Sequence, residues 1–270
     1  MTKTGRNLML YKNLAIAIIT ALGLQMSICN ANDKTDESVD KKSSHDMHWS
    51  YQGDTGPEHW GSLSEKYAAC ATGKKQSPIN IVDSSTTDLP LLEFNYNPIP
   101  LVIENNGHTI KMNADEAGTL KVGDETYQLL QFHTHAPSEG AINNIRSDMV
   151  LHLVHQNAQN KLAVVALLLK AGEVANPLIE TLWNVMPTSV GEAQKHDVQI
   201  DINQLLPKDR SYYNYDGSLT TPPCTEGVNW IVLKQPMSIS TKQLEQYQAV
   251  YSHNARPLQD LNDRKVLSSD

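Results

Sequence analysis

Hydrophobic residues along most of the chain occur in short runs separated by turn residues. The run at 101–103 leads into Asn105-Asn106-Gly107, a sequence typical of a tight turn in which the glycine adopts a positive φ. Residues 108–112 then alternate in polarity, with the period of a half-buried strand. Further apolar runs follow at residues 127–132, 149–154, 162–169 and 230–233. Repeated short strands joined by turns predict a mostly antiparallel β-sheet.

The pattern indicates one domain rather than several. Helical periodicity is weak except near residues 177–186 and 241–251, where we expect short helices. From Met47 to the end of the chain there is no internal repeat and no second low-complexity break. We therefore expect one mostly β (mixed α+β) domain over residues 47–270, long enough to bury a sizeable core. No glycine-rich phosphate-binding motif is present, so nucleotide chemistry has no support in the sequence.

The first 31 residues have the layout of a secretory signal peptide. An apolar run at 14–24 follows a start whose only charges are the basic residues Lys3, Arg6 and Lys12. Residues 29–31, Cys-Asn-Ala, resemble a cleavage site with small residues, so we expect a signal peptide over 1–31. A membrane anchor is the alternative, but the apolar stretch of about 15 residues is shorter than the ~20 that span a bilayer. Residues 32–46 are polar without an apolar period and predict a flexible linker.

Composition and charge narrow the compartment and the partners. The sequence contains no Asn-X-Ser/Thr sequon, which favours secretion into a bacterial periplasm over a eukaryotic secretory route. Lipidation of Cys29 is an alternative to its removal, although Ile28 before it is bulkier than such signals usually allow. The formal net charge is −8, and removal of the basic N-terminus makes it more negative. We therefore expect neither nucleic acid nor stable membrane insertion. The oligomeric state stays open, a homodimer included.

Cleavage of the signal peptide would leave two cysteines, Cys70 and Cys224. In an oxidising compartment, two cysteines in one domain are most simply explained by a disulfide. Such a bond would close a loop of about 154 residues and ideally stabilise the fold by ~5 kcal/mol through chain entropy. Two buried free thiols are the alternative.

The segment 131–135, Gln-Phe-His-Thr-His, is the strongest sign of chemistry among the ten histidines. Residues two apart in a strand point to the same face, so His133 and His135 direct their rings at one point. Zinc accepts imidazole nitrogen at about 2.0–2.1 Å, and a catalytic zinc site keeps three protein ligands and one open position. Two surface histidines would give the same pattern, so a metal site needs a third ligand.

That third ligand has to come from elsewhere in the chain. His152 and His155 lie in the apolar run that starts at residue 149, and three residues apart in a strand means opposite faces. Only one of them can join the pair, and the strand register that decides between them is unknown. The histidines at positions 45, 48, 59, 196 and 253 have no comparable setting, and we expect them at the surface or in hydrogen bonds.

Six segments of the chain resemble the signature blocks of alpha-class carbonic anhydrases, in the family's order. They are 56–60 (GPEHW), 76–81 (QSPINI), 106–108 (NGH), 131–135 (QFHTH), 151–155 (LHLVH) and 219–223 (LTTPP). The resemblance extends from about residue 47 to Pro257. It implies a central twisted, mostly antiparallel sheet of about ten strands with short peripheral helices. It also implies a zinc enzyme that reversibly hydrates carbon dioxide to bicarbonate and a proton through attack by zinc hydroxide.

The resemblance also implies roles for individual residues. It makes His133, His135 and His152 the zinc ligands and leaves His155 on the other face. The outer partners of two of these ligands would be Gln131 and the backbone of Asn254. Cys70 and Cys224 match a disulfide of secreted members.

The remaining matched residues concern the reaction. Thr220 would lie next to the zinc-bound oxygen with its hydroxyl donating to Glu139, which fixes the orientation of the attacking hydroxide. His108 would be the proton shuttle at the cavity mouth, since a pKa near 6.5 lets histidine accept and release a proton. Carbon dioxide is small and apolar and suits an apolar wall. The residues matched to substrate binding are Val154, Val164, Leu219, Thr221 and Trp230.

Two positions depart from the family pattern near the third ligand. Gly140 stands where the family usually has histidine, after the glutamate matched by Glu139. Val150 stands where it usually has the glutamate that accepts a hydrogen bond from the third ligand. The outer nitrogen of His152 thus lacks its expected acceptor, unless water or a backbone carbonyl replaces it. Such losses cost ~10–100-fold in metal affinity or activity, so we expect weaker zinc retention with catalysis preserved.

A third departure and two alternative functions complete the picture. Lys111 stands where the family more often has a neutral residue, which predicts a lowered pKa for His108. A non-catalytic binding module on the same fold is the alternative function, but members of that kind typically lose a zinc ligand, and this chain keeps all three. A general zinc hydrolase would need a carboxylate base such as that of His-Glu-X-X-His, a motif that the sequence lacks.

Overall fold

The structure is a computed structural model that describes residues 48–270. The predicted signal peptide (1–31) and linker (32–46) lie outside these residues, as does Met47. Within the described part, strands dominate and the longest helix has 8 residues. None of the helices in residues 48–270 is long and apolar enough to cross a membrane.

Thirteen strands form one large sheet. They are β2 (Ser85–Thr86), β3 (Leu92–Tyr96), β4 (Ile99–Asn105), β5 (Ile110–Asn113), β6 (Gly118–Val122), β7 (Glu125–His135), β9 (Met149–Asn157), β10 (Leu162–Gly172), β11 (Gln194–Ile200), β12 (Tyr212–Ser218), β13 (Glu226–Leu233), β14 (Met237–Ser240) and β15 (Leu267–Ser268). Ten follow one another in the order β11-β4-β5-β7-β9-β10-β13-β12-β15-β2, while β3, β6 and β14 pair beside this path. A separate parallel pair consists of β1 (Asn80–Ile81) and β8 (Ala141–Ile142).

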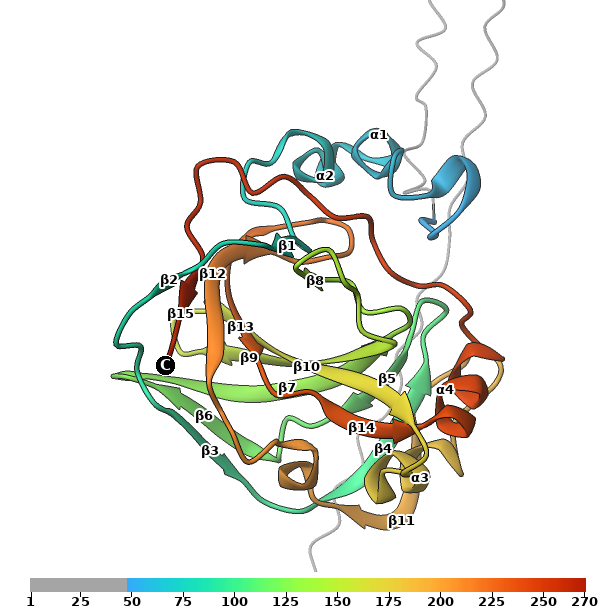
Figure 1. Cartoon of the computed structure of the whole chain (residues 1–270). Helices are drawn as coiled ribbons and strands as arrows, with labels where there is room; N and C mark the ends of the chain where they lie inside the picture. Colours follow the sequence, from blue (N-terminus) through green and yellow to red (C-terminus); the bar gives the residue numbers. More distant parts are fainter. Residues whose placement is uncertain (1–47) are drawn as a thin grey trace, which may run out of the picture. The chain divides into compact units, whose positions relative to one another are not determined.

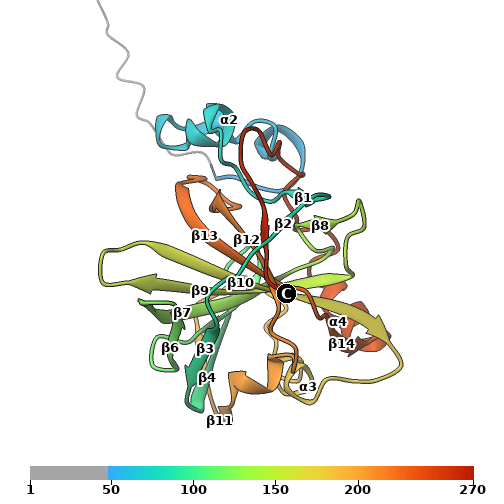
Figure 2. The same ribbon diagram turned by 60° about the vertical axis from the view of Figure 1, so that its left-hand side comes forward.

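Most neighbouring strands of the large sheet run antiparallel. The exceptions in the described residues are β10, which runs parallel to β13 and to β14, and β15, which runs parallel to β2. Figure 1 shows the long strands β7, β9 and β10 at the centre, and Figure 2 shows the strands fanning out, as expected of a twisted sheet. The expected fold is confirmed, with three strands beyond the expected ten.

Four short α-helices lie outside the sheet. They are α1 (Trp60–Leu63), α2 (Ala69–Thr72), α3 (Pro177–Trp183) and α4 (Thr241–Gln248), and three single 3₁₀ turns are η1 (Gly53–Thr55), η2 (Glu65–Tyr67) and η3 (Ile202–Leu205). The Asn176 side chain caps α3 by accepting from two backbone N–H groups. Ser240 and Gln243 form a capping box at the start of α4. Both predicted helices are present, and each ends three residues before the predicted boundary.

The central strands separate two hydrophobic cores. Along β9, Met149, Leu151 and Leu153 belong to the larger core, whereas Val150 and Val154 belong to the smaller one on the opposite face. Because side chains alternate along a strand, His152 points to the face of the smaller core. The large core fixes the sheet, and the opposite face carries the polar chemistry.

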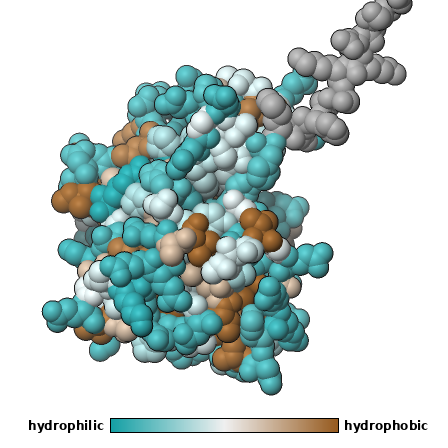
Figure 3. All heavy atoms as spheres, turned by 90° about the vertical axis from the view of Figure 1, so that its right-hand side faces the viewer, coloured by the Kyte–Doolittle hydropathy of each residue, from teal (hydrophilic) through white to brown (hydrophobic). Residues whose placement is uncertain are grey.

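The surface carries a few large apolar side chains among polar ones. On the face shown in Figure 3, hydrophobic residues occur in small groups between hydrophilic ones. The large hydrophobic residues with the most exposure are Val82, Leu91, Ile145, Val174 and Val190. The homodimer left open by the sequence stays open.

Candidate metal centre

Two neighbouring strands bring three histidine rings together. β7 carries His133 and His135, and β9 carries His152 directly opposite His133 in the antiparallel register. The ring centroids are separated by 5.0 Å (His133–His135), 5.3 Å (His133–His152) and 4.9 Å (His135–His152). One nitrogen from each ring lies within 4.8 Å of the others. The three rings can therefore share one metal ion.

The strand register excludes His155 from this cluster. Its ring lies on the opposite face, where it is fully buried and hydrogen-bonds through Nε2 to the Tyr96 hydroxyl at 2.6 Å. Burial lowers the pKa of His155 to about 4, so the ring is neutral near neutral pH. His155 is thus a structural residue of the larger core.

Two acceptors orient the rings of the first pair. Nδ1 of His133 lies 2.8 Å from Gln131 Oε1, and Nδ1 of His135 lies 2.6 Å from the backbone carbonyl oxygen of Asn254. Since these oxygens accept from Nδ1–H, each ring keeps Nε2 without a proton, directed at the cluster. The structure therefore brings Gln131 and the backbone of Asn254 into contact with two of the three rings.

The protonation and burial of the cluster fit zinc. Burial, followed by the neighbouring His135, lowers the pKa of His133 and His152 well below its usual range, so both rings are in the neutral form that coordinates a metal. Nε2 of His135 is buried and has no hydrogen-bond partner among residues 48–270. Buried polar atoms rarely remain without a partner, and a metal ion would satisfy this one. Three imidazole nitrogens are a donor set that zinc accepts.

Glu139 lies beside the cluster and is fully buried. Its Oε1 accepts a hydrogen bond from the backbone N–H of Arg256 at 2.9 Å. Its Oε2 lies 3.5 Å from His135 Nε2 and 3.9 Å from His152 Nδ1, without a hydrogen-bond partner in the described chain. Thr220 is buried as well, but no hydrogen bond joins its hydroxyl to Glu139 in this part of the chain. That hydrogen bond stays a prediction.

Arg256 is a part of the site that the sequence did not reveal. Its side chain is almost completely buried and donates to Gln76 Oε1, Ser77 O and Cys70 O at 2.8–3.1 Å. These acceptors hold the chain on either side of the guanidinium, and the Arg256 backbone in turn holds Glu139. A single arginine without a pattern around it gives no sequence signal; only Gln76 and Ser77, in one of the matched segments, pointed to this region.

The apolar residues matched to substrate binding lie side by side on three strands. Val154 of β9 faces Val164 of β10, and Val164 faces Trp230 of β13. All three belong to the smaller core, and Leu219 packs against it. The Trp230 ring lies 5.0 Å from the His152 ring. An apolar wall therefore adjoins the metal cluster.

The loop that carries Thr220 and Thr221 is tied to the rest of the fold. A disulfide joins Cys70 of α2 to Cys224, with 5.0 Å between the Cα atoms, which confirms the expected bond. The Cys224 N–H donates to the carbonyl oxygen of Thr221 at 2.9 Å. The disulfide thus anchors the loop three residues after Thr221.

His108 lies in the turn between β4 and β5 rather than in a strand. The expected strand at 108–112 begins at Ile110, because Asn106 and Gly107, with φ of 89° at the glycine, form the turn before it. The ring is half-buried and stacks on Trp49, with centroids 3.6 Å apart and planes 9° apart. The His48 ring also stacks on the His108 ring, with 4.9 Å between the centroids.

The pKa of His108 is lowered to about 4, chiefly by burial and then by His48. The lowered pKa agrees with the expectation from the sequence, but its cause is different. Lys111, the residue expected to cause it, pairs with Glu104 at 2.5 Å and acts instead on the pKa of His133.

The two departures near the third ligand lie where the sequence placed them. Val150 precedes His152 by two residues on β9, so both side chains point to one face, and Val150 is buried. Gly140 follows Glu139. Among residues 48–270, no hydrogen bond to the His152 ring is formed. The weaker zinc retention expected from this stays a prediction.

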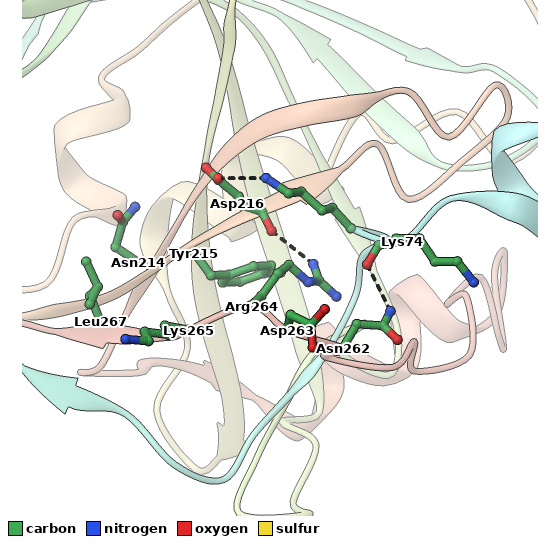
Figure 4. Close-up of a pocket in the computed structure, with 10 residues that line it drawn as sticks. Lys74, Asn214, Tyr215, Asp216, Asn262, Asp263, Arg264, Lys265 and Leu267 are labelled. Carbon is green, nitrogen blue, oxygen red and sulfur yellow. Dashed lines mark hydrogen bonds and ion pairs between the residues drawn. The ribbon is translucent and has the colours of Figure 1, made fainter.

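An open pocket of about 530 Å³, lined in part by residues 214–216 of β12, contains none of the three clustered histidines (Figure 4). Two of its cationic side chains have partners: Lys75 pairs with Asp216 at 3.3 Å, and the Arg264 guanidinium donates to the backbone carbonyl oxygens of Asp216 and Asp260. The pocket has no histidine or cysteine in its lining. We therefore regard this pocket as a structural feature of the surface rather than as a candidate site.

Comparison with known proteins agrees with this geometry. The family described as "Eukaryotic-type carbonic anhydrase" matches residues 55–270. A carbonic anhydrase of Neisseria gonorrhoeae is 46% identical over 222 residues, which cover 82% of this chain and 87% of the relative. The alpha-carbonic anhydrase of Photobacterium profundum has a TM-score of 0.77 at 41% identity, covering 82% of this chain and 100% of its own.

A second solved structure, the alpha-carbonic anhydrase of Thermovibrio ammonificans in complex with the inhibitor sulfanilamide, has a TM-score of 0.76 at 41% identity. It covers 82% of this chain and 98% of its own. The histidine cluster, the twisted sheet and these matches lead to one conclusion: the chain belongs to the alpha-class, or eukaryotic-type, carbonic anhydrase family and is an enzyme of that family.

Proposed function

We propose that the protein catalyses the reversible hydration of carbon dioxide to bicarbonate and a proton at a zinc ion held by His133, His135 and His152. The observation that carries this proposal is the convergence of three ring nitrogens within 4.8 Å of one another. When bound there, zinc supplies a Lewis acid that lowers the pKa of a coordinated water to about 7, a value known from carbonic anhydrase itself.

The residues around the cluster would bind and orient the reactants. Val154, Val164 and Trp230 form an apolar surface next to His152, and a small apolar molecule such as carbon dioxide is held better there than among polar groups. The Thr220 hydroxyl would donate to Glu139 Oε2, which has no partner in the described residues, and would then orient the nucleophile as an acceptor. Leu219 and Thr221 would complete this side of the site.

His108 would pass the product proton to solvent. Its half-buried position in the turn before β5 and its contact with Trp49 support a place between the site and the surface. A pKa of about 4 makes the ring a quick donor but a weak acceptor at neutral pH. We therefore expect proton transfer to contribute strongly to the pH dependence of the rate.

The disulfide and the bacterial relatives bear on the compartment in which the protein works. The Cys70–Cys224 bond and the bacterial carbonic anhydrases matched by the chain support a place outside the cytoplasm. Within our proposal, residues 1–31 direct the chain to a bacterial periplasm and are removed. N-terminal sequencing of the protein from a periplasmic extract would test this: a chain that still begins at Met1 would contradict it.

The experiment for the activity is stopped-flow carbon dioxide hydration with bound zinc quantified in the same sample. We expect fast hydration, sensitive to sulfonamide, at one zinc per chain. His152→Asn should abolish both zinc binding and hydration, whereas His59→Asn, an exposed histidine outside the cluster, should change neither. Stoichiometric zinc without hydration would contradict the proposal and indicate a non-catalytic binding module.

A further inference from the structure

The outer nitrogen of the third histidine has no protein partner, although the ring is buried. His152 Nδ1 and His135 Nε2 both approach Glu139 Oε2, so Nδ1 is the nitrogen of His152 on the cluster side. When Nδ1 binds a metal, the neutral ring must carry its proton on Nε2. No hydrogen bond to this ring is formed within residues 48–270, and the residue is only 2% exposed. Because polar groups in such a setting are normally hydrogen-bonded, the Nε2–H needs an acceptor.

A small cavity lies against the same ring. It has a volume of about 20 Å³ and is bounded by His152, Val150 and Gly140 on the side of the metal cluster. Strands β1, β8 and β10 contribute branched side chains to the remaining wall, namely Ile81, Ile142 and Leu168. One water molecule needs ~10–15 Å³, so the cavity holds a single water and little else. Gly140 contributes no side chain, and the valine at 150 is too short to close the space.

Two further oxygen-bearing side chains line this cavity. Glu139 lines it with its carboxylate, whose Oε2 lies on the cluster side, 3.9 Å from His152 Nδ1. The Tyr215 hydroxyl makes only one contact, with Ser77 Oγ at 3.5 Å, which is long for a hydrogen bond. A buried water needs two to four polar partners, and this lining offers the donor on His152, the Tyr215 hydroxyl and the Glu139 carboxylate.

We propose that one ordered water occupies this cavity, accepts the hydrogen bond from His152 Nε2 and so positions the third ligand for the metal. The inference rests on the proposed function, because it assigns His152 to a zinc ion. The water replaces the glutamate carboxylate that the family usually has at position 150 as the acceptor for His152. Zinc retention then depends on whether the cavity next to Gly140 and Val150 is large enough to hold the water.

The test fills the cavity with an added methyl group and measures the rate of zinc release. A high-resolution crystal structure of the zinc-loaded protein should show one water within hydrogen-bond distance of His152 Nε2. Gly140→Ala should displace it, since a Cβ there meets nothing closer than the Ile79 carbonyl oxygen at 3.6 Å and is sterically tolerated. We expect zinc release into excess chelator to become about tenfold faster or more. Gly172→Ala, the same change at a glycine with open space around it, should leave the release rate unchanged.

A second variant keeps the test independent of one substitution. Val150→Ile adds a methyl group at a second residue of the cavity lining and should also accelerate zinc release, with thermal unfolding used to verify that each variant folds. An empty cavity in the zinc-loaded crystal, or unchanged zinc release in both cavity-filling variants, would overturn the proposal. Stopped-flow hydration distinguishes failure of this inference from failure of the proposed function. A wild-type protein that binds zinc and holds the water but does not hydrate carbon dioxide would contradict the proposed function alone.

Discussion

The second nitrogen of each imidazole decides how the three rings of the cluster are held. His133 uses a side-chain oxygen and His135 a backbone oxygen, whereas His152 has neither among the described residues. A side-chain acceptor can be removed by mutation, but a backbone carbonyl cannot. The three ligands should therefore respond differently to substitutions around them.

Removal of the acceptor at His133 should weaken zinc binding. We expect Gln131→Leu to lower zinc affinity by ~10–100-fold, because Nδ1–H loses its partner and the ring loses its fixed orientation. Competition with a fluorescent chelator measures the change. Gln128→Leu, on the same strand but bonded to the Asp115 carbonyl oxygen, is the matched control and should bind zinc as the wild type does. Equal affinities in the two variants would show that Gln131 does not orient the ring.

The contact between His108 and Trp49 predicts that replacing Trp49 raises the pKa of His108. Burial is the largest cause of the low value of about 4, so Trp49→Ala should expose the ring and raise its pKa toward 6.5. An NMR titration of the His108 ring measures it, and Lys111→Gln should leave it unchanged because Lys111 is paired with Glu104. A pKa that stays near 4 in Trp49→Ala would show that burial against Trp49 is not the cause.

At the scale of elements, the apolar runs predicted the central strands, and the period of two along a strand predicted that His133 and His135 share a face. Strand β11 escaped prediction because most of its residues are exposed and polar, and it pairs only with β4 at the edge of the sheet. The residue pattern alone could not choose between His152 and His155, a choice that only the resemblance to the family implied. It depends on the register of β9 against β7, which shifts at an irregularity between Leu129 and Gln131. Registers follow from the packing of both faces, and no single segment contains that information.

The stability of the fold should depend on the disulfide that anchors the loop of residues 219–224. We expect Cys70→Ser to lower the free energy of unfolding by about 2–5 kcal/mol, since the bond restricts a long loop of the unfolded chain. Urea denaturation of the variant and of the wild type, each with and without reductant, measures the difference. The wild type in reductant should approach the variant, and the variant itself should not respond. A reductant effect of equal size in both proteins would contradict this account.

At the scale of the whole molecule, a buried neutral histidine makes stability depend on pH. The pKa of His155 is about 4 in the folded protein and about 6.5 in an unfolded chain, so the unfolded state binds more protons between these values. Stability is therefore fully present above pH 6.5 and falls as the pH drops toward 4. At pH 5 this one residue should lower the free energy of unfolding by about 2 kcal/mol relative to pH 8.

A substitution separates this contribution from that of other histidines. His155→Gln keeps a polar partner for the Tyr96 hydroxyl but cannot be protonated. Urea denaturation at pH 8 and pH 5 should show a loss of stability on acidification that is about 2 kcal/mol smaller in the variant than in the wild type. The same loss in both proteins would mean that His155 does not contribute.

The contacts of Asn254 and Arg256 bear on when the metal can be captured. All three histidines precede residue 153, yet the oxygen that orients His135 and the N–H that holds Glu139 belong to residues 254 and 256. A chain made from its N-terminus onward carries every metal-binding ring long before it carries the groups that align them. If the proposed function holds, zinc uptake should therefore come late in folding, and a chain cut short before residue 254 would carry the three histidines without the groups that orient His135 and hold Glu139.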